Sequence, residues 1–123
     1  MKLESHATVL QVPDVQAALA WFRDGLGFEV RPWQDGAAYG YAERDGVHFH
    51  VSTPGSELWK AYLYTDDVEA LHAELLERGA EIIQPPTDKD YGVRDLMVRA
   101  PGGHVLAIGQ LLYRFDREPP AAR

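Results

Sequence analysis

The chain has 123 residues, of which 46% are hydrophobic, so it is long enough for one domain with a packed core and too short for two. Its 12 Lys and Arg against 19 Asp and Glu give a net charge of −7, which disfavours nucleic acid and anionic lipid as partners. It has no cysteine, no apolar stretch near the ~20 residues of a membrane span, and no apolar signal-peptide core. We therefore expect a cytoplasmic globular domain that binds neither nucleic acid nor membranes.

The first half of the chain predicts a strand, a helix and three more strands. The expected strands are residues 7–12, 28–31, 39–43 and 47–52. Asp14 is placed to cap the helix, and Gly25 and Gly27 end it. The apolar stripe of this helix is Val15, Ala18, Leu19 and Phe22. Asp45-Gly46 is typical of a tight turn between the last two strands.

The same order of elements then starts again. The expected strands are residues 60–65, 81–84, 94–99 and 104–108, with a loop over 85–91. Asp66 and Asp67 are both cap candidates for the helix, which Gly79 ends. Its apolar stripe is Val68, Leu71 and Leu75, and Glu69, Glu74 and Glu77 face outward.

The two halves match by arithmetic. Asp14 falls on Asp67 at an offset of 67 − 14 = 53, and Gly46 falls on Gly103 at 103 − 46 = 57. We interpret this as an internal repeat of βαβββ modules over residues 5–53 and 58–110. The remaining residues 111–123 are predicted to be a solvated C-terminal tail. The predicted fold class is α+β.

Side chains alternate across a strand, so each strand has one face for the helices and one face opposite them. Aliphatic residues suit the helix side: Leu10, Val12, Phe49, Val51, Ala61, Leu63, Leu106 and Ile108. The other parity is aromatic and polar: Ala7, Val9, His48, His50, Ser52, Lys60, Tyr62, Tyr64, Val105 and Ala107. That composition indicates a ligand groove or, alternatively, an oligomer interface.

Three segments carry a family resemblance. Residues 13–15 (Pro-Asp-Val), 22–28 (Phe-Arg-Asp-Gly-Leu-Gly-Phe) and 94–103 (Arg-Asp-Leu-Met-Val-Arg-Ala-Pro-Gly-Gly) resemble the vicinal-oxygen-chelate superfamily of glyoxalases, bleomycin-resistance proteins and dioxygenases. The bleomycin-resistance branch is the most similar. The resemblance covers about residues 5–110. It implies two βαβββ modules that form a curved mixed sheet around a groove, and a homodimer.

Metal-dependent members of this superfamily draw His or Glu ligands from four strand positions. Here those positions hold Ala7, His50, Lys60 and Ala107. Alanine offers no donor atom and a lysine cation repels a metal, so the resemblance implies no metal, no other cofactor and no catalytic residues. His48 and His50 share a strand face and leave a metal-dependent lyase or dioxygenase as an alternative, although no carboxylate is expected at matching parity.

The bleomycin-binding branch holds its drug between aromatic rings. The matching positions are Tyr39, Tyr62, Tyr64 and Tyr91, with Ser52 as a polar groove residue and Trp33 close to another aromatic position. Together with His48, His50 and Lys60 these are the predicted ligand-binding residues. The resemblance implies a non-catalytic protein that sequesters a flat, aromatic and cationic small molecule, such as a bleomycin-type antibiotic, in a groove at the dimer interface. A binding module for another aromatic metabolite is an alternative.

The remaining polar candidates are interpreted as structural. His6 lies one residue out of register with Ala7 and should point to the opposite face. Glu43, Asp95 and Arg99 could form a polar cluster on the hairpins, but no pairing among them makes a general acid–base arrangement. Trp21 is expected on the far side of its helix from the apolar stripe.

Overall fold

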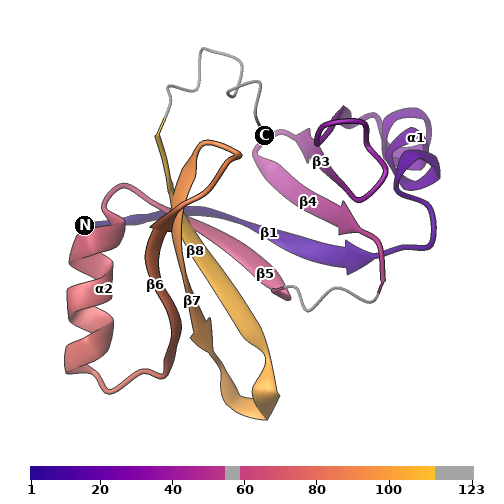
Figure 1. Ribbon diagram of the computed structural model, residues 1–123. Coiled ribbons are helices and arrows are strands. Elements are labelled where there is room, and N and C mark those ends of the chain that lie inside the picture. The colour runs from indigo at the N-terminus through magenta and orange to yellow at the C-terminus, as the bar shows by residue number, and fades with distance from the viewer. Residues whose placement is uncertain (55–58, 113–123) are drawn as a thin grey trace. The chain divides into compact units, whose positions relative to one another are not determined.

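The computed structural model describes residues 1–54 and 59–112, in which the elements follow the order βαβββ twice (Figure 1). The first set is β1 (Leu3–Gln11), α1 (Val15–Leu26), β2 (Glu29–Pro32), β3 (Tyr39–Arg44) and β4 (Val47–Ser52). The second set is β5 (Ala61–Thr65), α2 (Val68–Glu77), β6 (Ile82–Asp88), β7 (Val93–Arg99) and β8 (Val105–Leu111), with a 3-10 turn at Pro101–Gly103. The predicted α+β class is confirmed. Among the described residues no helix is long and apolar enough to cross a membrane.

The chain divides into two units, which we call the N-terminal unit (residues 6–58) and the C-terminal unit (residues 1–5 and 59–123). In the N-terminal unit the strand order is β2-β3-β4-β1. The β1–β4 pair is parallel, with Ala7 opposite His48, and the β2–β3 and β3–β4 pairs are antiparallel. Helix α1 packs against β2, β3 and β4, and the core there is Val15, Leu19, Phe22, Ala42 and Val51.

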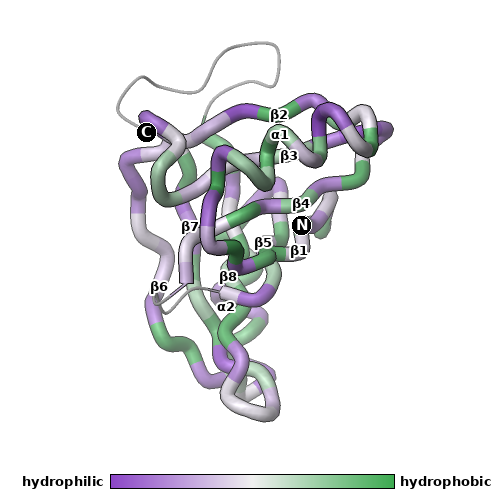
Figure 2. The backbone as a smooth tube through the Cα atoms, turned by 90° about the vertical axis from the view of Figure 1, so that its right-hand side faces the viewer, coloured by the Kyte–Doolittle hydropathy of each residue, from purple (hydrophilic) through white to green (hydrophobic). Residues whose placement is uncertain are grey.

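Local sequence signals explain where α1 begins and ends. The Asp14 Oδ1 atom accepts a hydrogen bond from the Ala17 backbone N–H at 3.0 Å, and Gly27 ends the helix in the left-handed conformation. The buried residues of α1, Val15, Leu19 and Phe22, recur at helical spacing, and Figure 2 gives the hydropathy of each position along the backbone. Trp21 lies on the outer side of α1 and is 58% exposed, as predicted. Leu10 lies on the helix side, as predicted, since it pairs with Val51, but it is 38% exposed because α1 packs mainly over β2, β3 and β4.

In the C-terminal unit the strand order is β5-β8-β7-β6. The β5–β8 pair is parallel, and the β7–β8 and β6–β7 pairs are antiparallel. Helix α2 packs through Val68 and Leu71 against Leu96 and Ile108. Of the two cap candidates, Asp67 caps α2 through the Ala70 N–H at 3.0 Å, whereas Asp66 Oδ1 accepts from the Lys2 backbone N–H at 2.8 Å.

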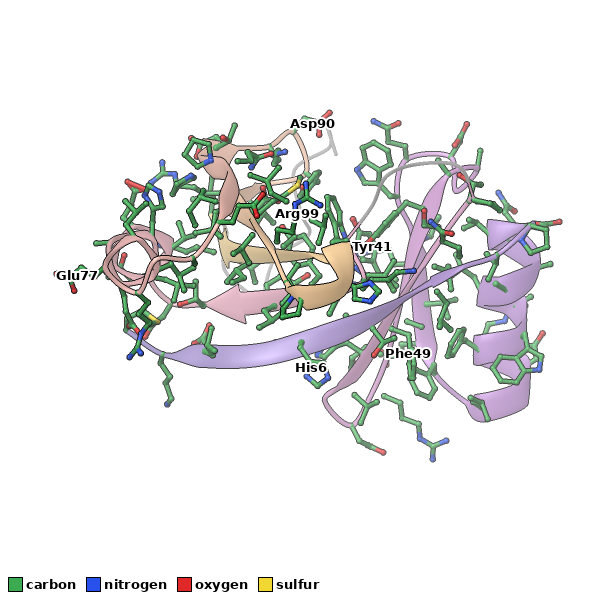
Figure 3. The ribbon with its side chains drawn as sticks, turned by 90° about the horizontal axis from the view of Figure 1, so that it is seen from below. His6, Tyr41, Phe49, Glu77, Asp90 and Arg99 are labelled. Carbon is green, nitrogen blue, oxygen red and sulfur yellow. The ribbon has the colours of Figure 1, made fainter. Side chains whose placement is uncertain are left out.

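The outer side of α2 is charged, as its sequence pattern predicts. Glu77, labelled in Figure 3, lies on this side and points away from the strands. The carboxylate of Glu74 pairs with Arg78 one turn further on, at 2.8 Å.

Several predicted boundaries differ from the structure. Strand β1, for example, begins at Leu3, before the predicted start at residue 7. The loop expected over residues 85–91 is strand as far as Asp88, because β6 is the edge strand of its sheet and a register shift between Gln84 and Thr87 takes Pro85 and Pro86 out of the ladder with β7. Strand β8 runs to Leu111 and so includes the first residue of the predicted tail. Residues 113–123 of that tail lie outside the described part of the chain.

Candidate functional site

In each unit, the sheet face opposite the helix carries aromatic and polar side chains. The N-terminal polar face comprises Ala7, Val9, Arg31, Tyr39, Tyr41, His48, His50 and Ser52. The C-terminal polar face comprises Tyr62, Tyr64, Val93, Asp95, Met97 and Ala107, with Trp59 and Tyr91 packed against it. Tyr41 and Phe49, labelled in Figure 3, illustrate the alternation: Phe49 packs in the α1 core, and Tyr41 belongs to the opposite face.

A buried carboxylate organises the C-terminal polar face. Asp95 is 0% exposed, and its Oδ2 atom accepts hydrogen bonds from the phenols of Tyr62 and Tyr91, both at 2.6 Å. Its Oδ1 atom accepts from Gln84 Nε2 at 3.0 Å. The Lys89 ammonium donates to Gln84 Oε1 at 2.8 Å and lies 3.7 Å from Asp95 Oδ1. Both carboxylate oxygens therefore have donors, as a buried charge requires.

This network holds two tyrosines in fixed positions. Tyr62 is 3% exposed, and burial raises the pKa of its phenol well above the usual 10, with smaller contributions from Tyr91 and Asp95. The phenol therefore stays protonated and continues to donate to Asp95 at neutral pH. The half-buried Tyr91, bonded to the same carboxylate, presents a ring whose orientation is set before any ligand arrives.

Gly109 makes the contact between Tyr62 and Asp95 possible. It lies opposite Asp95 on the neighbouring strand and opposite Tyr64 on the other side. A Cβ atom at this position would lie 2.7 Å from the Tyr62 hydroxyl and 2.5 Å from Val93 Cγ1. The absence of a side chain at Gly109 therefore leaves room for the Tyr62 phenol to reach Asp95.

The aromatic rings of the C-terminal polar face lie in contact. The centroids of Tyr62 and Tyr64 are 5.1 Å apart, and those of Trp59 and Tyr62 are 5.4 Å apart. Tyr64, Tyr91 and Trp59 are half-buried, so each keeps part of its ring surface exposed. Such rings suit stacking against a flat heterocycle, at ~0.5–1.5 kcal/mol for each pair beyond burial.

The N-terminal polar face contains a second, histidine-centred cluster. The Tyr39 hydroxyl and His50 Nδ1 are hydrogen-bonded at 2.6 Å, and the Tyr41 ring meets the His50 ring edge-on with centroids 4.9 Å apart. His50 is 4% exposed, and burial lowers its pKa to about 3, assisted by the nearby His48 and Arg31. The imidazole is therefore neutral at physiological pH.

Two N–H donors of this unit are buried without an acceptor. The Nε atom of Arg31 and the Nε1 atom of Trp33 have no hydrogen-bond partner within residues 1–54 and 59–112. The Arg31 guanidinium lies over the Tyr41 ring, with Cζ 5.3 Å from the ring centroid. A buried donor left unbonded costs ~1–3 kcal/mol, so the pair calls for an explanation.

The residues at the four metal positions of metal-dependent relatives do not fit a divalent ion. Ala7 and Ala107 carry only a methyl group, and Lys60 is an exposed cation whose backbone N–H bonds Val105. His50 is the only donor of the four, and its Nδ1 is bonded to the Tyr39 hydroxyl. The part of the chain that the structure describes contains no group of three or more His, Cys, Asp or Glu side chains placed to hold a metal.

One expectation about His48 is corrected by the register. A carboxylate does occupy matching parity, since Glu43 lies directly opposite His48 in the β3–β4 pair. The Glu43 Oε2 atom accepts a hydrogen bond from the Gly46 backbone N–H at 3.0 Å, so this carboxylate closes the β3–β4 turn. The turn itself has positive φ angles at Asp45 and Gly46, as the Asp-Gly signal predicts.

The nine predicted ligand-binding residues fall into two sets. The N-terminal unit holds Trp33, Tyr39, His48, His50 and Ser52, and the C-terminal unit holds Lys60, Tyr62, Tyr64 and Tyr91. Within their units the structure brings Tyr39 together with His50, and Tyr62 with Tyr64 and with Tyr91 through Asp95. Ser52 is buried and donates to the Thr53 carbonyl at 3.1 Å. Their role in binding stays a prediction.

Sequence reasoning missed three residues of these faces. Tyr41 shares the parity of Tyr39 within one strand, so alternation alone could have found it. Arg31 needed the β2–β3 register, which places it opposite Tyr41. Asp95 was named as part of a polar cluster with Glu43 and Arg99, but its partners are tyrosines, and Arg99 pairs with Glu81 at 3.1 Å. His6 is exposed whereas its neighbour Ala7 is buried, which agrees with the structural role expected for His6.

The sequence matches the model of one protein superfamily over most of its length. The model of the glyoxalase/bleomycin resistance protein/dioxygenase superfamily matches residues 5–108. The chain belongs to this superfamily. The bleomycin-resistance branch is not singled out by this match, and a comparison with curated proteins finds no significant relative.

Solved structures share the fold at low sequence identity. A superfamily member from Vibrio splendidus 12B01 is 24% identical with a TM-score of 0.63, over 89% of this chain and 99% of that one. A hypothetical protein from Bacillus halodurans C-125 is 13% identical with a TM-score of 0.68, over 94% and 98%. Methylmalonyl-CoA epimerase from Mycobacterium tuberculosis is 14% identical with a TM-score of 0.64, over 89% and 87%. At such identities the likeness concerns the fold alone, which this superfamily uses for more than one function.

Proposed function

We propose that this superfamily member is a non-catalytic binding protein that sequesters a flat aromatic small molecule, of which a bleomycin-type antibiotic is the leading example. The ligand stacks on the rings of the C-terminal polar face. The observation that carries this proposal is the bonding of Tyr62 and Tyr91 to the buried Asp95 carboxylate at 2.6 Å. Rings held in place before binding lose little conformational entropy when a ligand stacks on them.

The chemistry of the polar groups supports binding rather than catalysis. Asp95 has donors on both oxygens, so it is poorly placed to act as a base. The His50 imidazole has a pKa of about 3, far below the value that suits a general base near pH 7. The methyl side chains at Ala7 and Ala107 supply no ligand for a catalytic metal.

The remaining parts of the proposal concern the charge of the ligand and the assembly. The net charge of −7 and the faces of the tyrosine rings favour a ligand with a cationic group. A homodimer with two equivalent ligand sites is the assembly that the family resemblance implies. Another aromatic metabolite of the same shape would use the same rings.

Substitution of Tyr64 tests the stacking surface. Tyr64→Ala removes a half-buried ring that packs against Tyr62, so it should weaken bleomycin binding about tenfold, the loss of roughly one stacked and buried ring. Fluorescence titration of the purified protein measures the dissociation constant. Tyr62 is unsuitable for this test because it is buried and bonded to Asp95, so its removal would act on folding.

The matched control is Trp21→Ala, which removes an exposed ring from the outer side of α1 and should leave the affinity unchanged. Equal affinities of the wild type, Tyr64→Ala and Tyr91→Ala would place the ligand elsewhere and overturn the site. If Tyr64→Ala lowers the affinity for another flat heterocycle more than it lowers the affinity for bleomycin, the stacking surface is retained and the other compound replaces bleomycin as the proposed ligand.

A further inference from the structure

We infer that Arg31 and Trp33 form a binding site for a carboxylate group of a planar small molecule on the N-terminal polar face. Arg31 lies in β2 opposite Tyr41, and Trp33 follows directly after β2, two residues further along the same ladder. The Trp33 backbone N–H still bonds the Tyr39 carbonyl at 2.9 Å, which continues the β2–β3 ladder to this point. This site is independent of the stacking surface proposed for the C-terminal unit.

Two N–H donors on this face have no hydrogen-bond acceptor in the described part of the chain. Arg31 Nε and Trp33 Nε1 are both buried and have no acceptor in the described part of the chain. Buried N–H groups in folded proteins are bonded with few exceptions, and an exception calls for a partner that the chain does not supply. Two such donors, at the end of β2 and directly after it, suit a group with two acceptor oxygens, as a carboxylate has.

The positive charge of the Arg31 guanidinium also favours an anionic ligand. Arg31 forms no salt bridge with any carboxylate among residues 1–54 and 59–112, so its positive charge has no counter-ion there. Besides Tyr39 and Tyr41, the other titratable side chains on this side of the strands are His48 and His50, together with Glu29 and Glu43 at the far end of β2 and β3. Glu43 is engaged by the Gly46 N–H, and Glu29 is exposed. An anionic ligand would supply the missing counter-charge, at a site where the guanidinium is already partly removed from water.

The surroundings of the Arg31 guanidinium suit a planar ligand. The Arg31 guanidinium lies over the Tyr41 ring, which restricts its orientation, and Tyr41 in turn packs edge-on against His50. Strand β2 is at the edge of the sheet of this unit, so no further strand of the unit covers the outer side of Arg31. The aromatic neighbours give a planar acid an apolar surface beside the two donors, which favours an aromatic carboxylate over a small ion.

The test is a titration with 2-naphthoate followed by the indole N–H signals in ¹H–¹⁵N spectra of the full chain. Trp33→Phe removes one of the three indole signals and so identifies that of Trp33, since the chain has Trp21, Trp33 and Trp59. We expect this signal to move downfield and saturate as its N–H gains an acceptor, while that of Trp21 stays in place. The neutral analogue 2-naphthylmethanol should bind at least about tenfold more weakly, because it lacks the charge that Arg31 recognises.

Two variants separate the donors from the fold. Arg31→Gln should weaken 2-naphthoate at least about tenfold, and Trp33→Phe, which keeps an aromatic ring, should weaken it about threefold to tenfold. Arg23→Gln removes an exposed arginine that pairs with Asp24, and it should leave the affinity unchanged. The inference is overturned by saturation that leaves the Trp33 signal unmoved, by unchanged affinity in both Arg31→Gln and Trp33→Phe, or by no saturable binding at millimolar 2-naphthoate. Each of these results leaves the bleomycin test on Tyr64 unaffected.

Discussion

Replacing Asp95 by alanine lowers the free energy of unfolding by about 3–5 kcal/mol, because several buried donors lose their acceptor at once. Asp95 is fully buried, and its side chain accepts from Tyr62, Tyr91 and Gln84. Without the carboxylate, the phenols of Tyr62 and Tyr91 lose the Oδ2 atom that accepts from both, and Lys89 loses a negative charge 3.7 Å from its ammonium. Urea unfolding monitored by circular dichroism measures the difference, with the slope of the transition checking that the folded state is otherwise intact.

The matched control is Asp88→Ala, on the edge strand of the same sheet. Asp88 is exposed and pairs with Arg94 at 2.6 Å, and an exposed pair of this kind is screened by solvent and salt. Its removal should leave the free energy of unfolding nearly unchanged. A small effect of Asp95→Ala, equal to that of Asp88→Ala, would show that the Tyr62–Asp95–Tyr91 network does not hold the C-terminal polar face together.

Lowering the pH from 7 to 5 removes about 2 kcal/mol of stability through His50 alone. The folded imidazole has a pKa of about 3 because of burial, whereas an unfolded histidine titrates near 6.5. Below pH 6.5 the unfolded chain therefore binds a proton that the folded chain does not. The stabilisation is complete above this pH, is lost as the pH falls toward 3, and changes no further below it.

Denaturation by urea at a series of pH values measures this effect. His50→Gln keeps a hydrogen-bonding group beside the Tyr39 hydroxyl but cannot titrate, so its stability should vary less between pH 7 and pH 5 by about the same 2 kcal/mol. His104→Gln changes an exposed histidine and should keep the pH dependence of the wild type. Identical pH profiles for the wild type and His50→Gln would contradict the assignment of a buried, neutral imidazole.

Much of the fold follows from signals that act within a few residues. The caps at Asp14 and Asp67 and the left-handed turn at Asp45-Gly46 are local, and each forms as the sequence predicts. The internal repeat predicts the order of all the elements, which is βαβββ twice. Strand alternation also places His48 and His50 on the face opposite α1, because period-2 patterning needs no knowledge of neighbouring strands.

The features that sequence reasoning missed depend on which strands are neighbours. The prolines of β6 are compatible with a strand because that strand is at a sheet edge and its pairing with β7 shifts register between Gln84 and Thr87, neither of which the sequence encodes locally. The Asp95 network joins three strands, β5, β6 and β7, together with Tyr91 from the turn before β7, and it needs the gap over Gly109. The unbonded donors of Arg31 and Trp33 become visible only when every other acceptor has been placed.

The most direct test of the central claim is a calorimetric titration of chelator-treated protein with bleomycin, both metal-free and copper-loaded. We expect saturation at about one ligand per protomer, with a dissociation constant that Tyr64→Ala raises about tenfold. A flat titration with both forms of the drug would contradict the proposed antibiotic. A saturating titration that Tyr64→Ala and Tyr91→Ala leave unchanged would contradict the proposed stacking surface.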